Sequence, residues 1–153
     1  MKIVKRRTLF LLISAAFVLQ LTSFALAGEL VIIVNKKSGL QNITQKELQN
    51  LFLGKYKALP SGQIAVLFEQ KSSAESRQIF LDKIVQRTEA EYRANWSRMI
   101  FTGIARPPTQ VNSEEEVIKA IAETEAAISY VSASAISSVL STEQVKIIMR
   151  VSR

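Results

Sequence analysis

Side chains that can bind an anion follow a short apolar run near the middle of the 153-residue chain. The apolar run is Ile64–Phe68, and the polar residues after it are Lys71, Ser72, Ser73, Ser76 and Arg77. Hydroxyl, ammonium and guanidinium groups donate hydrogen bonds to oxyanions, and the two cations add opposite charge. The group therefore predicts binding of a small oxyanion without chemistry.

The residues around this group predict a strand that leads directly into a helix. Ile64–Phe68 has the length and aliphatic content of a buried strand. Ser72 followed by Glu75 is a capping-box pattern, so we expect a helix to begin at or just after Ser72. A helix N-terminus offers free backbone N–H groups and partial positive charge to an anion. The alternative is that the serines only cap the helix and that Arg77 is solvated.

Residues 1–27 predict a signal peptide. A basic segment precedes a mostly apolar stretch, and Ala25-Leu26-Ala27 supplies the small residues of a cleavage site. We expect cleavage after Ala27, export to the periplasm, and one domain over residues 28–153. A retained membrane anchor is the competing interpretation, because the apolar stretch is borderline in length for a span. The cleavage motif and the polar residues within the stretch favour removal, which leaves no stable anchor.

Composition narrows the chemistry that the chain can perform. The sequence has no cysteine and no histidine, so it lacks a disulfide framework, a thiolate zinc site and the usual general base. Residues 1–27 hold four of the 20 basic residues and none of the 13 acidic ones, which leaves a net charge of +3. We expect no enzymatic activity, no cofactor and no nucleic-acid partner. Glu114-Glu115-Glu116 suits the first turn of a helix better than a metal site.

The order of patterns along residues 28–153 predicts an α/β fold. Apolar runs of strand length occur at Leu30–Val34, Ile64–Phe68, Ala127–Val131 and Val145–Met149. Capping-box patterns open further helices at Thr44, Thr88 and Ser113. This alternation predicts a mixed or parallel sheet flanked by helices, in which ligands bind beyond the carboxyl ends of the strands. We expect the turn at residues 36–39 to lie at the same edge as residues 69–77.

Several segments, in the right order, resemble a known family. They are Leu51-Phe52-Leu53-Gly54-Lys55, Ser61-Gly62, Trp96, Phe101-Thr102-Gly103 with Pro107-Pro108, and Ala126-Ala127-Ile128-Ser129-Tyr130-Val131. The chain resembles the phosphate-binding substrate receptors of bacterial ABC transporters, which have the type 2 periplasmic-binding-protein-like fold. The resemblance implies a single lobe of that fold and phosphate or another small oxyanion as ligand. It also implies an ABC permease or another envelope protein as partner.

The ligand loop departs from the family pattern. The family has Arg-Ser-Asp-Gly-Ser-Gly-Thr where this chain has Glu69-Gln70-Lys71-Ser72-Ser73-Ala74-Glu75. Glu69 replaces the arginine and Lys71 the aspartate, whereas Ser73 is retained. A carboxylate at position 69 repels a phosphate dianion, and Lys71 partly offsets it. The second hypothesis is therefore a degenerate domain that binds a protein, or a second copy of itself, at the exposed half of the cleft.

Two features outside the loop also lead to expectations. Arg106 precedes two prolines, so a rigid extended loop can present its guanidinium to an anion. Tyr92 and Trp96 stand four residues apart on an expected helix, a spacing that favours the core over a ligand platform.

Overall fold

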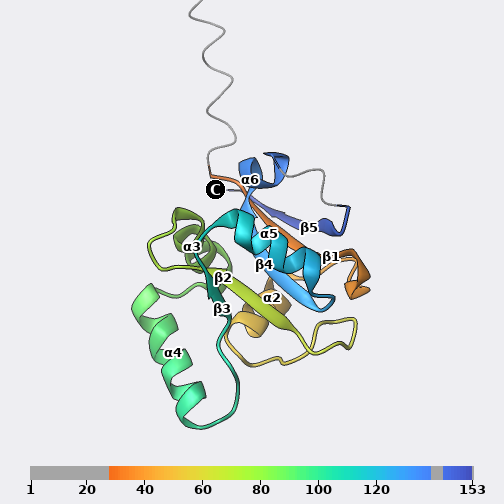
Figure 1. Ribbon diagram of the computed structural model, residues 1–153. Helices are drawn as coiled ribbons and strands as arrows, with labels where there is room; N and C mark the ends of the chain where they lie inside the picture. The colour runs from red at the N-terminus through yellow and green to blue at the C-terminus, as the bar shows by residue number, and fades with distance from the viewer. Residues whose placement is uncertain (1–27, 139–142, 153) are drawn as a thin grey trace, which may run out of the picture.

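A computed structural model describes residues 28–138 and 143–152 (Figure 1). The five strands are β1 (Leu30–Asn35), β2 (Val66–Gln70), β3 (Thr109–Val111), β4 (Ala127–Ser132) and β5 (Val145–Val151). The α-helices are α2 (Gln45–Phe52), α3 (Glu75–Phe80), α4 (Glu89–Phe101), α5 (Glu114–Glu123) and α6 (Ala133–Ser138). A 3₁₀ helix, η1 (Lys36–Ser38), follows β1, and a π-helix, η2 (Leu81–Val85), continues α3. The predicted α/β fold is confirmed, whereas the signal-peptide prediction lies outside the described residues.

The sheet is mixed, with the strand order β3-β2-β4-β1-β5. β2 runs parallel to β3 and β4, so these three strands end at one edge, at Gln70, Val111 and Ser132. β1 is antiparallel to β4 and β5. The turn at residues 36–39 therefore lies at the opposite edge from residues 69–77, and the expectation that they share an edge is wrong.

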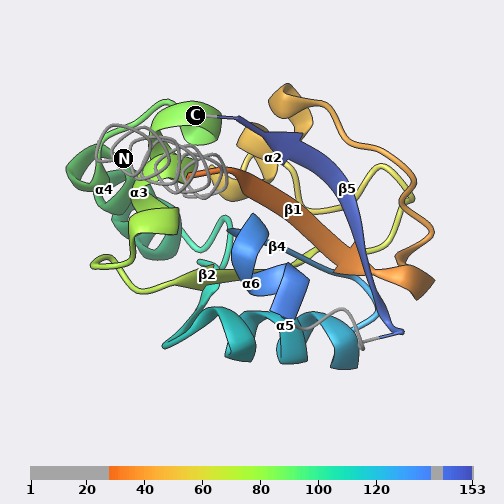
Figure 2. The same cartoon turned by 90° about the horizontal axis from the view of Figure 1, so that it is seen from above.

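Both faces of the sheet are covered by helices. Figure 2 shows α2 and α5 on opposite sides of the strands. Leu30, Ile32 and Val34 pack into one core cluster, while Val31 and Ile33 pack into another. Successive side chains of a strand point to opposite faces, which explains why the β1 sequence is a continuous apolar run. Within the described residues, no helix has both the length and the apolar character needed to cross a membrane.

Two of the predicted capping boxes are complete. Thr44 Oγ1 accepts a hydrogen bond from the Glu47 amide at 3.2 Å, and Glu47 Oε2 accepts one from the Thr44 amide at 2.8 Å. Thr88 caps α4 in the same way. Ser113 accepts from the Glu116 amide at 3.2 Å, but the Glu116 carboxylate accepts from the Asn112 amide, so this box is only half formed.

The predicted capping box at Ser72 is wrong. α3 begins at Glu75, its N-cap is Ala74, and no side chain caps it. The Ala74 amide donates to the Lys71 carbonyl at 3.0 Å, which closes a turn over Lys71–Ala74. This turn delays the start of the helix, so Ser72 lies outside it.

The predicted strand at Ile64–Phe68 is shifted along the chain by two residues. Ile64 makes only an isolated bridge with Ala58 and is 71% exposed. β3 pairs with β2 only from Phe68 onward, so the first two residues of β2, Val66 and Leu67, have no paired strand on the β3 side. Glu69 and Gln70, which the sequence places in a polar turn, instead end the strand and are buried.

Candidate functional site

The turn that joins β2 to α3 lies at the edge where the parallel strands end (Figure 1). Lys71, Ser72 and Ser73 are all exposed on this turn. The structure therefore brings three of the five predicted anion-binding residues to one stretch of surface. Their hydroxyl and ammonium groups can donate hydrogen bonds to a small oxyanion that approaches from solvent.

Ser76 and Arg77, the other two predicted residues, are buried. Ser76 Oγ donates to Gln70 Oε1 at 2.8 Å. Arg77 is 1% exposed and uses its guanidinium on protein acceptors. Nη1 lies 2.8 Å from both the Gln70 carbonyl and Glu69 Oε1, while Nε and Nη2 donate to the Glu89 carboxylate at 2.9 and 3.1 Å. Arg77 is thus neither a solvated residue nor a surface ligand, but an internal counter-ion.

Glu69 is the centre of a buried polar network. Besides the ion pair with Arg77, its carboxylate accepts hydrogen bonds from Tyr92 Oη at 3.0 Å and Gln110 Nε2 at 3.2 Å. The Arg77 guanidinium carbon also lies 5.3 Å from the centre of the Tyr92 ring, a cation–π distance. A buried carboxylate is tolerated when its charge and lone pairs are matched in this way. The charge reversal at position 69 is therefore compensated within the fold by Arg77.

The protonation states of this network are fixed by burial and charge. Burial alone would lower the pKa of the Arg77 guanidinium, but its hydrogen bonds to Glu89 and Glu69 and the charge of Glu69 raise it above its ordinary value. Burial, reinforced by the Glu69 charge, raises the pKa of Tyr92 well above its ordinary value of 10.0. Arg77 therefore stays charged and Tyr92 stays a neutral donor to Glu69 at all physiological pH values.

A second acid, the half-buried Glu114, joins the ends of β2 and β4 by hydrogen bonds. Its Oε1 accepts from the Ser132 amide at 2.7 Å and from Gln70 Nε2 at 3.2 Å, and its Oε2 accepts from Ser132 Oγ at 2.6 Å. Glu114 is the first residue of α5, where a carboxylate is favoured by the helix dipole. Across the described residues, no group of three or more acidic side chains is arranged to hold a metal ion.

A cavity of about 390 Å³ adjoins this edge of the sheet. Its lining includes the carboxylates of Glu29, Glu75 and Glu114, together with Ser76 and Ser132. Three carboxylates around one small volume oppose the entry of an anion. The exposed Lys71–Ser73 turn, rather than this cavity, is therefore the candidate oxyanion site.

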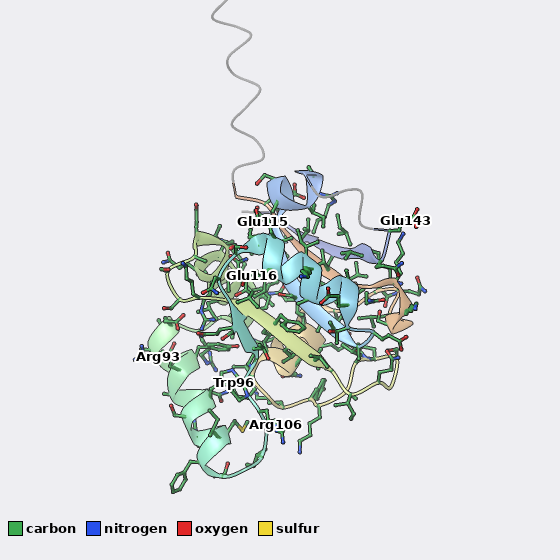
Figure 3. All side chains as sticks on the ribbon, in the orientation of Figure 1. Arg93, Trp96, Arg106, Glu115, Glu116 and Glu143 are labelled. Carbon is green, nitrogen blue, oxygen red and sulfur yellow. The ribbon has the colours of Figure 1, made fainter. Side chains whose placement is uncertain are left out.

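Arg106 and Trp96 lie elsewhere, where both line a groove between α4 and β2 (Figure 3). Arg106 is therefore not among the residues around the Lys71–Ser73 turn. Tyr92 and Trp96 are buried in the core cluster that α2 and α4 share, as their spacing predicts.

Comparison of the chain with family models gave no match, and comparison with curated protein sequences gave none either. Solved structures do match. An ABC-type phosphate transport receptor from Vibrio cholerae superposes with a TM-score of 0.59 at 18% identity, over 82% of this chain and 48% of the receptor. PstS from Borrelia burgdorferi gives a TM-score of 0.61 at 16% identity, over 79% of this chain and 47% of PstS. The chain has the fold of one lobe of a phosphate-binding receptor.

The receptor-lobe fold confirms the family resemblance at the level of structure. A Clostridium perfringens protein assigned to phosphate ABC transporters, solved with bound phosphate, matches in the same way, with a TM-score of 0.56 at 12% identity, over 82% of this chain and 56% of that protein. The chain spans about half the length of these receptors. They are transport binding proteins, and at this level of identity the match shows the fold that the chain shares with them.

The sequence did not reveal the partners that complete the Glu69 network. Glu89, Tyr92 and Gln110 come from α4 and β3, which are distant in sequence from β2. One local signal was present, because Arg77 follows Glu69 by eight residues and carries the opposite charge.

Proposed function

We propose that the protein is an exported receptor-like lobe that binds phosphate or another small oxyanion at the Lys71–Ser73 turn. One observation carries this proposal: Glu69, the residue expected to repel an anion, is buried and paired with Arg77 at 2.8 Å. Arg77 offsets the Glu69 charge while also pairing with Glu89, and the exposed Lys71 supplies positive charge at the surface. The retained Ser73 and its neighbour Ser72 supply hydroxyl donors beside that charge.

The proposed binding is weak, because Lys71, Ser72 and Ser73 are exposed and leave the bound anion in contact with water. A single exposed charge and two hydroxyls in a high-dielectric setting support an affinity on the order of 1 mM, or ~4 kcal/mol. A role in phosphate transport then requires a second component, and an ABC permease or another envelope protein in the periplasm is the proposed partner. The partner would enclose the anion from the other side.

Isothermal titration of residues 28–153 with inorganic phosphate tests the proposal. We expect saturable binding in the millimolar range, and a loss of affinity of at least threefold in Ser73→Ala and in Lys71→Ala, because each removes one donor. Lys119→Ala removes an exposed cation on α5 and serves as the matched control. The proposal would be contradicted if no saturable heat appeared up to ~20 mM phosphate, 20-fold above the expected dissociation constant of ~1 mM. An equal loss of affinity in Lys119→Ala would also contradict it.

The second candidate function is a protein-interaction or sensory module without a small ligand. It is favoured by a groove with exposed apolar side chains that lies away from the turn. An envelope protein or a second copy of the chain would cover the open surface. Analytical ultracentrifugation of residues 28–153 distinguishes self-association from a hetero-partner.

A further inference from the structure

A groove of about 750 Å³ lies between α4, the segment after α2 and the first half of β2. Its walls include Ile64 and Val66 from the β2 side and Trp96, Ile100 and Ile104 from the α4 side. Figure 3 places the labelled Trp96 and Arg106 there, and Figure 1 places the loop between α4 and β3 at the lower end of the molecule. The Lys71–Ser73 turn is not part of this groove.

The large apolar side chains that the described residues expose gather around this groove. They are Tyr56, Ile64, Val66, Ile100, Phe101 and Ile104. All but Phe101 line the groove, and Phe101, which is 93% exposed, directly follows Ile100. Single exposed apolar residues are ordinary on a protein surface, but a contiguous set around a hollow is typical of an interaction site.

The groove is held open by contacts in its floor and walls. Asn95 Nδ2 donates to the Leu53 carbonyl at 3.1 Å and joins α4 to the end of α2. Gly54 lies against the Trp96 ring so closely that a Cβ there would stand 2.9 Å from the ring. On the other wall, the Ala65 amide donates to the Lys57 carbonyl at 2.9 Å. A pre-formed hollow accepts a partner without first reorganising.

The charges at the groove are all positive. Lys57 and Arg106 belong to its lining, and no acidic residue does. A partner with carboxylates beside its apolar residues complements this arrangement. In a two-fold dimer through this face the same basic residues would meet each other, so charge disfavours a second copy as the occupant. The concave shape suits an extended or helical segment that inserts side chains, more than a flat membrane surface.

We propose that this groove binds a segment of a partner protein that carries apolar residues flanked by Asp or Glu. The apolar residues fill the space between Ile64 and Ile100, and the flanking carboxylates pair with Lys57 and Arg106. This binding is independent of the oxyanion turn, since the two surfaces share no residue. It extends the second candidate function, the protein-interaction module, by naming the surface that binds and the residue types that the partner carries.

A random peptide library displayed on phage and selected on residues 28–153 tests the proposal. We expect enriched sequences in which two or more apolar residues are flanked by Asp or Glu. A synthetic peptide of the leading sequence should bind at least tenfold more weakly to Ile100→Asp and to Ile64→Asp. Ile64 lines the groove and is 71% exposed, so its variant keeps the fold even if Ile100→Asp does not, and circular dichroism verifies this.

Three further measurements on the same peptide complete the test. Lys57→Glu and Arg106→Glu should each weaken binding about tenfold and reduce its salt dependence, while Lys71→Ala should leave it unchanged. No enriched motif, enriched peptides without acidic residues, or binding that is insensitive to Ile100→Asp and Ile64→Asp would overturn the proposal. Equally strong binding of residues 28–153 to vesicles of phosphatidylcholine and phosphatidylglycerol, lost in Ile64→Asp, would assign the face to lipid and overturn it too.

Discussion

Glu69 stands where the receptor pattern has an arginine, and Arg77 forms an ion pair with it. The side chains of Arg77 and Glu69 are 2% and 6% exposed and their charged atoms lie 2.8 Å apart. A buried ion pair adds little net stability compared with apolar residues, because both charges lose their hydration. Removing only one partner is costly, however, since it strands a charge in the interior. The pair therefore fixes the structure under the Lys71–Ser73 turn.

We predict that Arg77→Met lowers the free energy of unfolding by about 3–5 kcal/mol, since Glu69 and Glu89 then lose their cation. In the double variant Arg77→Met/Glu69→Gln the loss should be smaller, because the stranded charge is gone and an amide still bonds Tyr92 and Gln110. Urea unfolding followed by circular dichroism measures both. If the double variant were less stable than Arg77→Met, the contribution of Arg77 to the free energy of unfolding would not come from its ion pair with Glu69.

Ionisation of Tyr92 makes the free energy of unfolding decrease at alkaline pH. Burial and the Glu69 charge raise its pKa in the folded protein well above 10.0. A raised pKa contributes stability that is fully present below pH 10.0 and is lost as pH rises toward the folded pKa. We predict a fall of up to ~1.4 kcal/mol per pH unit above pH 10 from this group, seen as a lower urea midpoint.

The matched variants for this pH dependence are Tyr92→Phe and Tyr56→Phe. Tyr92→Phe should flatten the decline above pH 10, although Tyr130, whose pKa burial and Glu69 also raise, keeps part of it. Tyr56 is half exposed, so Tyr56→Phe should leave the curve unchanged. Identical alkaline slopes for the two variants would refute the assignment to Tyr92.

Some of the candidate site could be read from single residues, and some could not. Lys71, Ser72 and Ser73 were predicted because the residue types and the strand–turn–helix pattern are local. Arg77 was placed wrongly at the surface, since its partners on α4 are brought to it only by tertiary packing.

The starts of the helices differ in whether a side chain caps them. We predict that Thr44→Ala and Thr88→Ala each lower the free energy of unfolding by about 1 kcal/mol, because each removes the side chain that caps a helix. Ser72→Ala should change it by less than about 0.5 kcal/mol, as expected for an exposed residue that caps nothing. A cost for Ser72→Ala equal to that of the threonine variants would place the start of α3 at Ser72 after all.

Gly54 links the end of α2 to the floor of the apolar groove. Its φ is +73°, and a Cβ would stand 2.9 Å from the Trp96 ring. We predict that Gly54→Ala costs at least 2 kcal/mol, roughly the sum of left-handed strain and displacement of a core ring. Gly103→Ala is the control, because its φ is +66° but nothing lies within 4 Å, so only the ~1 kcal/mol backbone cost remains. Equal urea midpoints for the two variants would rule out the close approach of Trp96.

The elements were predictable where a local pattern decides them. The Thr44 and Thr88 boxes are short-range hydrogen-bond motifs, and β1 is an apolar run covered on both sides, so the sequence alone located them. β2 was displaced because pairing with β3 and β4, not the apolar content of Ile64–Phe68, determines which residues form the strand. The antiparallel direction of β1 likewise depends on its pairing with β4 and β5, so the sequence alone did not predict it.

At the scale of the whole molecule, one receptor-like lobe carries two separate surfaces. One surface is the Lys71–Ser73 turn, and the other is the groove lined by Lys57 and Arg106, which contains no residue of that turn. The α/β fold was predictable from alternating patterns and family-like segments. The groove was not predictable, because the sequence alone does not distinguish an exposed apolar residue from a buried one.

The most direct test of the central claim is a phosphate titration of ¹⁵N-labelled residues 28–153 followed by ¹H–¹⁵N NMR. The account predicts concentration-dependent shifts, saturating at millimolar phosphate, that are largest for the amides of Lys71, Ser72 and Ser73. In Ser73→Ala the same shifts should require at least threefold more phosphate. Sulfate at the same ionic strength distinguishes a phosphate preference from a general oxyanion site. Shifts confined to other surfaces, or none beyond those that sodium chloride produces, would contradict the account.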